Sequence, residues 1–213
     1  MKKLLKNKKR CLAAALMVVL SFAVSTGVTS AYLSKTPDNL TNVVTAGSVT
    51  ISLVENAWNA SNAENIHPLQ SVKKDPSVRN TGKNDAWVFL EVSVPRKNIN
   101  VVSTDTKRKT TKQLRDLYTF EPNTLYWDLI KDTVTATEHT YVYGYKETLK
   151  PGFLTPALFT SIKAVNYLEG ELNANETLTV NVTAKAIQDN VVSDGTLSGI
   201  YNALLSQAAA DAI

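Results

Sequence analysis

The stretch Ala86-Trp87-Val88-Phe89-Leu90-Glu91-Val92-Ser93-Val94 alternates in side-chain character along its whole length. Its even-numbered residues are all apolar, whereas the odd-numbered ones begin with two aromatic rings and end with Glu91 and Ser93. Successive side chains of a strand point to opposite faces, so one face is predicted to be buried throughout and the other only at its start. This is typical of an interior strand of a β-sandwich. We expect it to end at Pro95, because proline cannot donate a hydrogen bond to the sheet.

Shorter runs of the same kind recur, separated by segments rich in Asn, Asp, Gly and Pro. Further strands are expected over Ser48–Glu55, Ser71–Arg79, Leu125–Ile130, Thr133–Tyr145, Ala157–Val165 and Leu178–Gln188. After Thr196, helical spacing of apolar residues predicts a short C-terminal helix; these residues are Leu197, Ile200, Tyr201, Leu204, Leu205 and Ala208. The predicted fold class is therefore all-β, an antiparallel jelly-roll-like β-sandwich with long loops and one short helix.

The first 31 residues have the three parts of a secretory signal peptide. Six basic residues come first, an apolar run covers Leu12–Val24, and the small residues Thr29 and Ala31 precede Tyr32. We expect cleavage between Ala31 and Tyr32, and hence a secreted protein that meets the membrane only through its signal. An uncleaved membrane anchor is the alternative, but a membrane span needs about 20 apolar residues and this run is shorter.

Cleavage changes the charge of the protein. The chain has 23 Lys and Arg against 19 Asp and Glu, a net charge of +4, and the signal holds six basic residues and no acidic one. The mature chain therefore keeps 17 basic and 19 acidic residues, a net charge of −2. Its charge gives no reason to expect nucleic acid or an anionic membrane as a partner.

The single cysteine, Cys11, lies in the signal, so the mature chain has no disulfide, thiol nucleophile or cysteine metal site. Its two histidines, His67 and His139, stand 72 positions apart and belong to no zinc-binding pair. Three aspartates would form a calcium site only if they converged at one end of the sandwich: Asp75, Asp85 and Asp128. We predict no catalytic residue, no cofactor and no metal.

Three further features have two interpretations each. His139, Tyr141, Tyr143 and Tyr145 share one face of a predicted strand and are either cross-strand packing partners or a sugar-stacking surface. The segment 96–115 is either a basic patch for DNA or polysaccharide, or a solvated loop with a short helix from about Thr111. Its basic residues include Lys107, Arg108, Lys109, Lys112 and Arg115, and because no aromatic residue stands among them we favour the loop. Trp58, in a loop, is expected to cover one end of the core.

Several segments together resemble the TasA/camelysin family of secreted Gram-positive proteins. They are Ser30-Ala31-Tyr32 at the end of the signal, Thr45–Leu53, Lys73–Gly82 followed by Ala86-Trp87-Val88, and Val182–Gln188. The resemblance implies cleavage by an ER-type signal peptidase, a jelly-roll sandwich, and assembly into biofilm-matrix fibres at the cell surface. In such fibres the N-terminal arm of one subunit completes the sheet of the next.

The chain is thus divided into a signal peptide (1–31), an N-terminal arm (32–45) and a sandwich domain (46–213) with its basic loop at 96–115. The arm carries apolar anchors for strand addition to another copy of the chain: Tyr32, Leu33, Leu40, Val43 and Val44. The principal hypothesis is a non-enzymatic homopolymer. The alternatives are a camelysin-like metalloendopeptidase, which would need both histidines to meet a carboxylate, and a monomeric surface-binding module that uses the tyrosine face.

Overall fold

The computed structural model describes residues 41–45, 49–59, 66–172, 178–191 and 193–210; for residues 41–45 it describes the backbone. All of them belong to one compact unit, Leu40–Ile213. The strands are β1 (Thr41–Thr45), β2 (Ile51–Val54), β3 (Ser71–Lys73), β4 (Ser77–Asn80), β5 (Ala86–Ile99), β6 (Gln113–Asp116), β7 (Tyr118–Phe120), β8 (Trp127–Val134), β9 (Glu138–Tyr145), β10 (Ser161–Ala164) and β11 (Asn181–Gln188). One helix, α2 (Leu197–Ala210), follows them.

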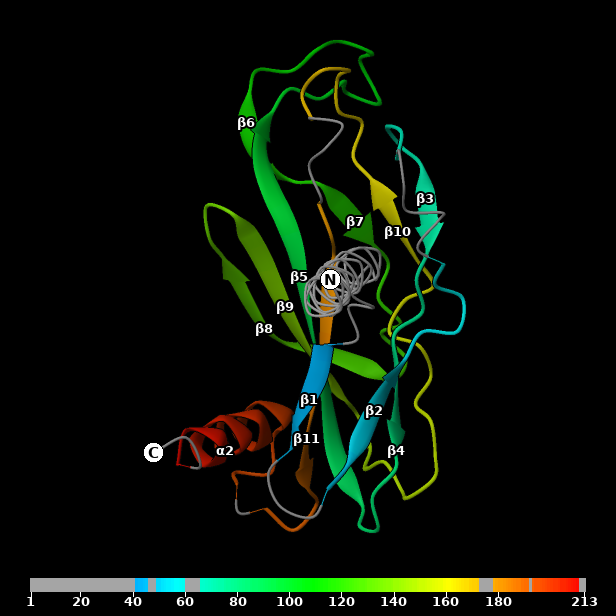
Figure 1. Cartoon of the computed structure of the whole chain (residues 1–213). Helices are drawn as coiled ribbons and strands as arrows, with labels where there is room; N and C mark the ends of the chain where they lie inside the picture. Colours follow the sequence, from blue (N-terminus) through cyan, green and yellow to red (C-terminus); the bar gives the residue numbers. More distant parts are fainter. Residues whose placement is uncertain (1–40, 46–48, 60–65, 173–177, 192, 211–213) are drawn as a thin grey trace, which may run out of the picture. The chain divides into compact units, whose positions relative to one another are not determined.

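The strands form two layers (Figure 1). The large sheet has the order β1-β11-β5-β9-β8, and β6 pairs with the last four residues of β5. The other layer consists of a three-stranded sheet, β3-β10-β7, and the pair β2-β4. The pairings are antiparallel except that of β1 with β11. This confirms the predicted all-β, jelly-roll-like antiparallel sandwich with a C-terminal helix.

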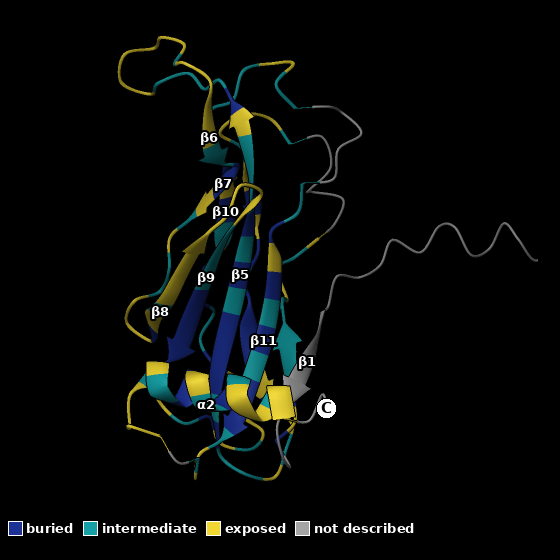
Figure 2. Ribbon diagram, turned by 90° about the vertical axis from the view of Figure 1, so that its left-hand side faces the viewer, coloured by how far each residue is buried: buried dark blue, intermediate teal, exposed yellow. Residues whose placement is uncertain are grey.

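The core lies between the two layers and contains inward-facing residues of both. Val88, Leu90 and Val92 of β5 are completely buried, as are Val78 of β4 and Trp127 of β8. Figure 2 shows the buried colour along the central strands of the large sheet, and exposed residues on β8 at its edge. Trp58 packs against the core cluster as expected, and the Lys74 ammonium lies 4.4 Å from the centre of its ring.

The central strand β5 shows the predicted alternation of buried and exposed residues, but it ends later than predicted. All five even-numbered residues of 86–94 are fully buried, and on the opposite face Phe89 is buried while Glu91 and Ser93 are partly exposed. The prediction that Pro95 ends the strand is wrong, because β5 continues to Ile99. The β11 ladder ends at Ser93 and the β6 ladder begins at Arg96. The missing proline N–H falls between two ladders, where the sheet loses no hydrogen bond.

Two other predicted strands prove to be pairs of strands. Ser71–Arg79 is interrupted at Lys74–Pro76, so that β3 joins β10 while β4 joins β2. The run Thr133–Tyr145 contains the end of β8, a turn and β9. In that turn the Thr135 hydroxyl oxygen accepts the N–H of Glu138 at 3.0 Å. A local turn of this kind reverses the chain although the run is rich in Thr, Val and Tyr, which favour strands.

The helix α2 covers one end of the outer face of the large sheet (Figure 2). Its apolar side buries Ile200, Tyr201 and Leu204 against Phe89 of β5, and the rings of Phe89 and Tyr201 lie 5.2 Å apart. Thr196 caps the helix, since its hydroxyl oxygen accepts the N–H of Gly199 at 3.0 Å. Among the described residues, no helix combines the length and apolarity that a membrane span requires.

Candidate assembly edge

The end of the predicted arm forms the outermost strand of the large sheet. β1 runs parallel to β11, from Thr41 opposite Thr183 to Thr45 opposite Ala186, and its register shifts once on the way. In the described part of the chain, no strand pairs with the other side of β1. Parallel pairing is slightly less stable per residue than antiparallel pairing. The single, short and irregular ladder of β1 is therefore weaker than the ladders of the central strands.

The neighbouring strand β11 does not depend on β1 for its position. All eight of its residues pair with β5 on the opposite side. Val182, Ala184 and Ala186 are buried in the core, and on the outer face Lys185 Nζ lies 2.6 Å from Glu91 Oε1. If β1 left, β11 would therefore stay in place, and its backbone N–H and C=O groups would form a ready acceptor for another strand.

Part of the predicted arm falls within the described residues. Val43 and Val44 belong to β1, and Val44 is registered opposite Lys185. The remaining arm residues and the predicted cleavage site lie outside the described residues: Ala31, Tyr32, Leu33 and Leu40.

The opposite edge of the large sheet, β8, is built differently. Ile130 is an extra residue in its ladder, because Leu129 and Lys131 are registered opposite the consecutive residues Tyr143 and Val142 of β9. The strand also carries Asp128, Lys131 and Asp132, all exposed. A bulge and charged side chains are the devices by which natural sheets prevent further strands from adding to an edge.

His139 lies in a polar cluster that joins four strands. Its Nδ1 lies 2.6 Å from Asp116 Oδ2 on β6, and its Nε2 lies 2.6 Å from Asp132 Oδ1 on β8. Arg96 of β5 donates from Nε to Asp116 Oδ1 at 2.7 Å. The ring of Tyr141 stacks on the imidazole with 4.0 Å between centres.

The predicted metal candidates are held by other contacts. His67 donates its backbone N–H to Gln70 Oε1, Asp75 Oδ1 accepts the N–H of Ala57 at 2.8 Å, and Asp128 pairs with Lys146 at 3.2 Å. Within the described ranges, no group of three or more His, Cys, Asp or Glu side chains could hold a metal ion. The structure therefore brings neither the three aspartates nor the two histidines into a metal-binding group.

The tyrosine face points into the sandwich. Tyr143 and Tyr145 are buried members of the core, and Tyr141 packs edge-on against Phe120 with 5.4 Å between ring centres. Burial raises the pKa of Tyr143 and of Tyr145 above its ordinary value, and nearby carboxylates add to the effect. A sugar cannot stack on rings that the second sheet covers, so the packing interpretation holds and the sugar-binding one is wrong.

The segment 96–115 contains strand instead of the expected helix. Arg96–Ile99 extend β5, β6 begins at Gln113, and between them a tight turn is closed by the N–H of Ser103 donating to the carbonyl of Arg108. Because β5 offers a free ladder beyond Pro95, pairing overrides the weak helical tendency near Thr111. Lys107, Arg108 and Lys109 are exposed at this turn, as a solvated loop predicts.

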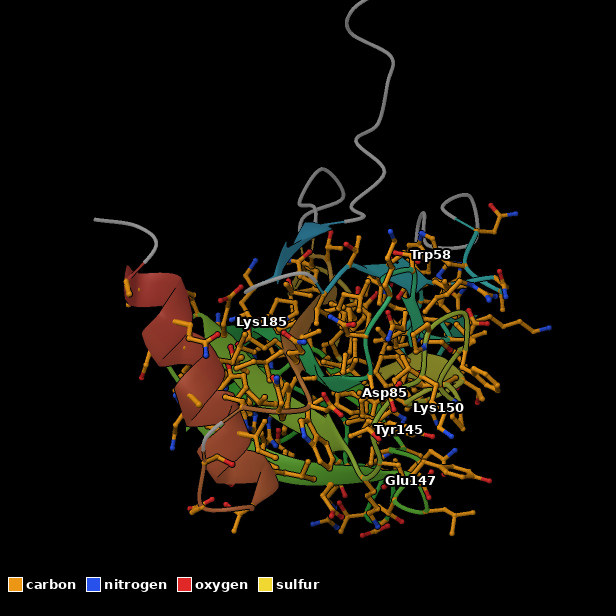
Figure 3. The ribbon with its side chains drawn as sticks, turned by 90° about the horizontal axis from the view of Figure 1, so that it is seen from below. Trp58, Asp85, Tyr145, Glu147, Lys150 and Lys185 are labelled. Carbon is orange, nitrogen blue, oxygen red and sulfur yellow. The ribbon has the colours of Figure 1, made fainter. Side chains whose placement is uncertain are left out.

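Two polar groupings were not anticipated. Asp116 and Asp132 stand 23 and 7 positions from His139, and no sequence motif links them. On the outer face, Glu91 accepts hydrogen bonds from Lys185 Nζ and from the Tyr201 hydroxyl of α2. Figure 3 shows Lys185 on the side of the domain that carries α2. For the second grouping, the sequence offered one indication: the alternation of their strands places both Glu91 and Lys185 on an outward face.

Comparison of the chain with models of protein families, with curated proteins and with solved structures found no match.

Proposed function

We propose that this protein is a secreted structural subunit that assembles into extracellular matrix fibres by exchange of its N-terminal arm between copies. The observation that carries the proposal is the position of β1, a short parallel strand on the edge of a sandwich that is complete without it. In a fibre, the arm of one subunit would pair with β11 of the next. This second pairing would reproduce the bonds that β1 makes within its own domain.

The energetics favour exchange only if the whole arm takes part. Each backbone hydrogen bond contributes ~1 kcal/mol net, so a five-residue strand contributes a few kcal/mol in either location. Association itself costs roughly 4–15 kcal/mol in lost translational and rotational freedom. The apolar anchors Tyr32, Leu33 and Leu40 would offset this cost, at roughly 1.5–3 kcal/mol for each well-buried side chain.

Signal cleavage would prepare the arm for this role. Cutting between Ala31 and Tyr32 by an ER-type signal peptidase would release the domain from the membrane and give the arm a free end. A free end can enter a neighbouring sheet edge, whereas an arm still tethered to the membrane is restricted. Cleavage and assembly would then occur in order, with polymer forming outside the cell at its surface.

Deleting Tyr32–Thr45 from the mature chain tests the proposal. The truncated protein is expected to fold, because its core residues lie on other strands, and to remain monomeric in size-exclusion chromatography and electron microscopy. Near-ultraviolet circular dichroism, which reports the buried Trp127, verifies folding. Fibres of normal appearance from the truncated protein would refute strand exchange.

A peptide of residues 32–45 supplies the matched control. Added to the truncated protein, it should occupy the vacant edge of β11 and bind with one-to-one stoichiometry, without restoring polymer. A peptide with the same composition in scrambled order should bind much more weakly, because the alternate side chains would no longer meet their pockets.

A further inference from the structure

The polar cluster at His139 places a carboxylate oxygen beside each nitrogen of the ring. A neutral imidazole carries one N–H and one lone pair, whereas an imidazolium donates from both nitrogens. Here each nitrogen of His139 faces a carboxylate oxygen at 2.6 Å, Asp116 on one side and Asp132 on the other. Carboxylates accept hydrogen bonds, so this arrangement is satisfied when the ring carries both protons.

Charged and titratable groups from four strands surround the ring. β5 contributes Arg96, β6 contributes Asp116, β8 contributes Asp132, and β9 contributes Tyr141, whose hydroxyl oxygen lies 2.8 Å from Nδ1 and 3.2 Å from Asp116 Oδ2. From β7, the uncharged Phe120 packs against Tyr141. Burial, then the charge of Asp116, raises the pKa of Tyr141, so its hydroxyl remains a donor.

The two carboxylates are not equivalent. Asp116 has a side chain 23% exposed and is also held by Arg96 Nε and the Tyr141 hydroxyl. Asp132 has a side chain 48% exposed, and its Oδ1 lies 2.6 Å from His139 Nε2. Water can therefore replace the imidazole at Asp132, while Asp116 is fixed beside Nδ1. When the ring loses a proton, the proton on Nε2 is the less costly one to lose.

We propose that His139 is a proton-dependent latch on the edge strand β8. With both nitrogens protonated, the ring ties Asp132 of β8 to Asp116 of β6 across β9. Loss of the Nε2 proton leaves a lone pair facing Asp132, so that this carboxylate turns to solvent and the end of β8 loosens. The β1 edge is unaffected, and the latch therefore operates in the monomer whether or not the arm exchanges between subunits.

Nitrogen NMR of the two imidazoles provides the first measurement. The chain has only two histidines, and His67 lies in an exposed loop, so its signals serve as an internal reference in the same spectrum. As His139 is titrated, its Nε2 signal is expected to change to that of an unprotonated nitrogen while Nδ1 keeps its proton. Loss of the proton from Nδ1 first would overturn the proposed direction of release.

Hydrogen exchange of the monomeric mature chain provides the second measurement. After correction for intrinsic base catalysis, amides of Lys131–Val134 should lose protection on the order of tenfold over the same titration, the equivalent of one charged hydrogen bond. Amides of β11 should not change. Protection of β8 that stays constant across the titration would overturn the latch.

Two substitutions on one strand separate the latch from a general charge effect. Asp132→Asn should abolish the pH dependence at β8, because an amide can accept from a protonated Nε2 and donate to an unprotonated one. Asp128→Asn removes the same charge four residues away, where it pairs with Lys146, and should leave the pH dependence unchanged. Equal effects of the two substitutions would show that the strand responds to charge alone and would refute the latch.

Discussion

The two edges of the large sheet show opposite chemistry on one scaffold. β1 reads Thr-Asn-Val-Val-Thr, without a charged residue, and pairs in parallel with a strand that is already fixed from its other side. β8 reads Trp-Asp-Leu-Ile-Lys-Asp-Thr-Val, with three charges and a bulge at Ile130. Open edges template further strands unless something prevents it. One edge of the sheet therefore carries charges and a bulge that oppose strand addition, whereas the sequence of the other edge carries no charge.

The contrast extends to how each edge is anchored. β8 begins at the fully buried Trp127, whose Nε1 donates to the carbonyl of Pro156 at 3.1 Å, and is tied near its end by Asp132 to His139. The backbone of β1 pairs with β11 and also lies close to β2. Backbone pairing is re-formed wherever a free edge of the right length exists, but a buried indole has no equivalent site elsewhere.

The largest effect is expected from placing charge on the uncharged edge. Changing Val43 and Val44 together to lysine should reduce polymer formation at least about tenfold, because strand addition would bury or crowd two ammonium groups at a site of β-strand pairing. Sedimentation of fibres from the mature chain measures this. The control is Thr133→Lys on the exposed, already charged β8, which should leave assembly intact. Equal loss from both changes would contradict the assigned roles of the edges.

The anchoring of β8 is tested by Trp127→Ala. Removing a fully buried indole from the core should lower the free energy of unfolding by about 3–5 kcal/mol, measured by denaturant titration. Leu125, two residues earlier and 72% exposed, is the matched control, and Leu125→Ala should change stability by less than about 0.5 kcal/mol. A small effect at Trp127 would mean that β8 is held by its ladder alone.

A smaller effect is expected at Tyr201, which fastens α2 over β5 and β11. Tyr201→Phe removes the hydrogen bond to Glu91 while Lys185 still compensates that carboxylate, so stability near neutral pH should fall by about 1–2 kcal/mol. Tyr126, exposed beside β8, provides a control: Tyr126→Phe should be nearly neutral.

The contribution of Tyr201 to stability should decrease at alkaline pH. Burial, and then the hydrogen bond to Glu91, raises the pKa of Tyr201 above its ordinary value of 10.0. The folded state thus keeps a proton that the unfolded state loses, so this contribution is complete below pH 10 and is lost as the pH rises further. Thermal unfolding between neutral and alkaline pH should show a steeper loss for the wild type than for Tyr201→Phe.

Buried and exposed positions were predictable from the sequence wherever a strand or helix keeps the same neighbours along its length. The alternation of 86–94 identified the interior strand, and the apolar spacing after Thr196 identified α2, because both depend on local periodicity. The predicted end at Pro95 was wrong, since a ladder can change partners at a proline without losing a hydrogen bond. The predicted helix near Thr111 was wrong because β5 supplied an unpaired partner for β6.

The candidate sites, too, were predictable only in part from the sequence. Residues 32–45 were predicted to form an arm ahead of the first strand. The described end of that segment is β1, whose parallel pairing with β11 joins residues about 140 positions apart. The cluster of Asp116, Asp132 and His139 was not predictable, because carboxylates on separate strands become neighbours only when the strands are registered. Side-chain chemistry can be read locally, whereas register is set by the whole sheet.

By itself, the sequence determined the all-β class, the buried face of the central strand and the C-terminal helix, since these follow from the period of apolar residues along one segment. It also indicated the signal and the arm, from charge and composition. Only the tertiary structure decided which strand lies at each edge, which edge carries the bulge, and which two carboxylates His139 meets. Those features depend on contacts between distant segments, which become neighbours only when the two layers close around the core.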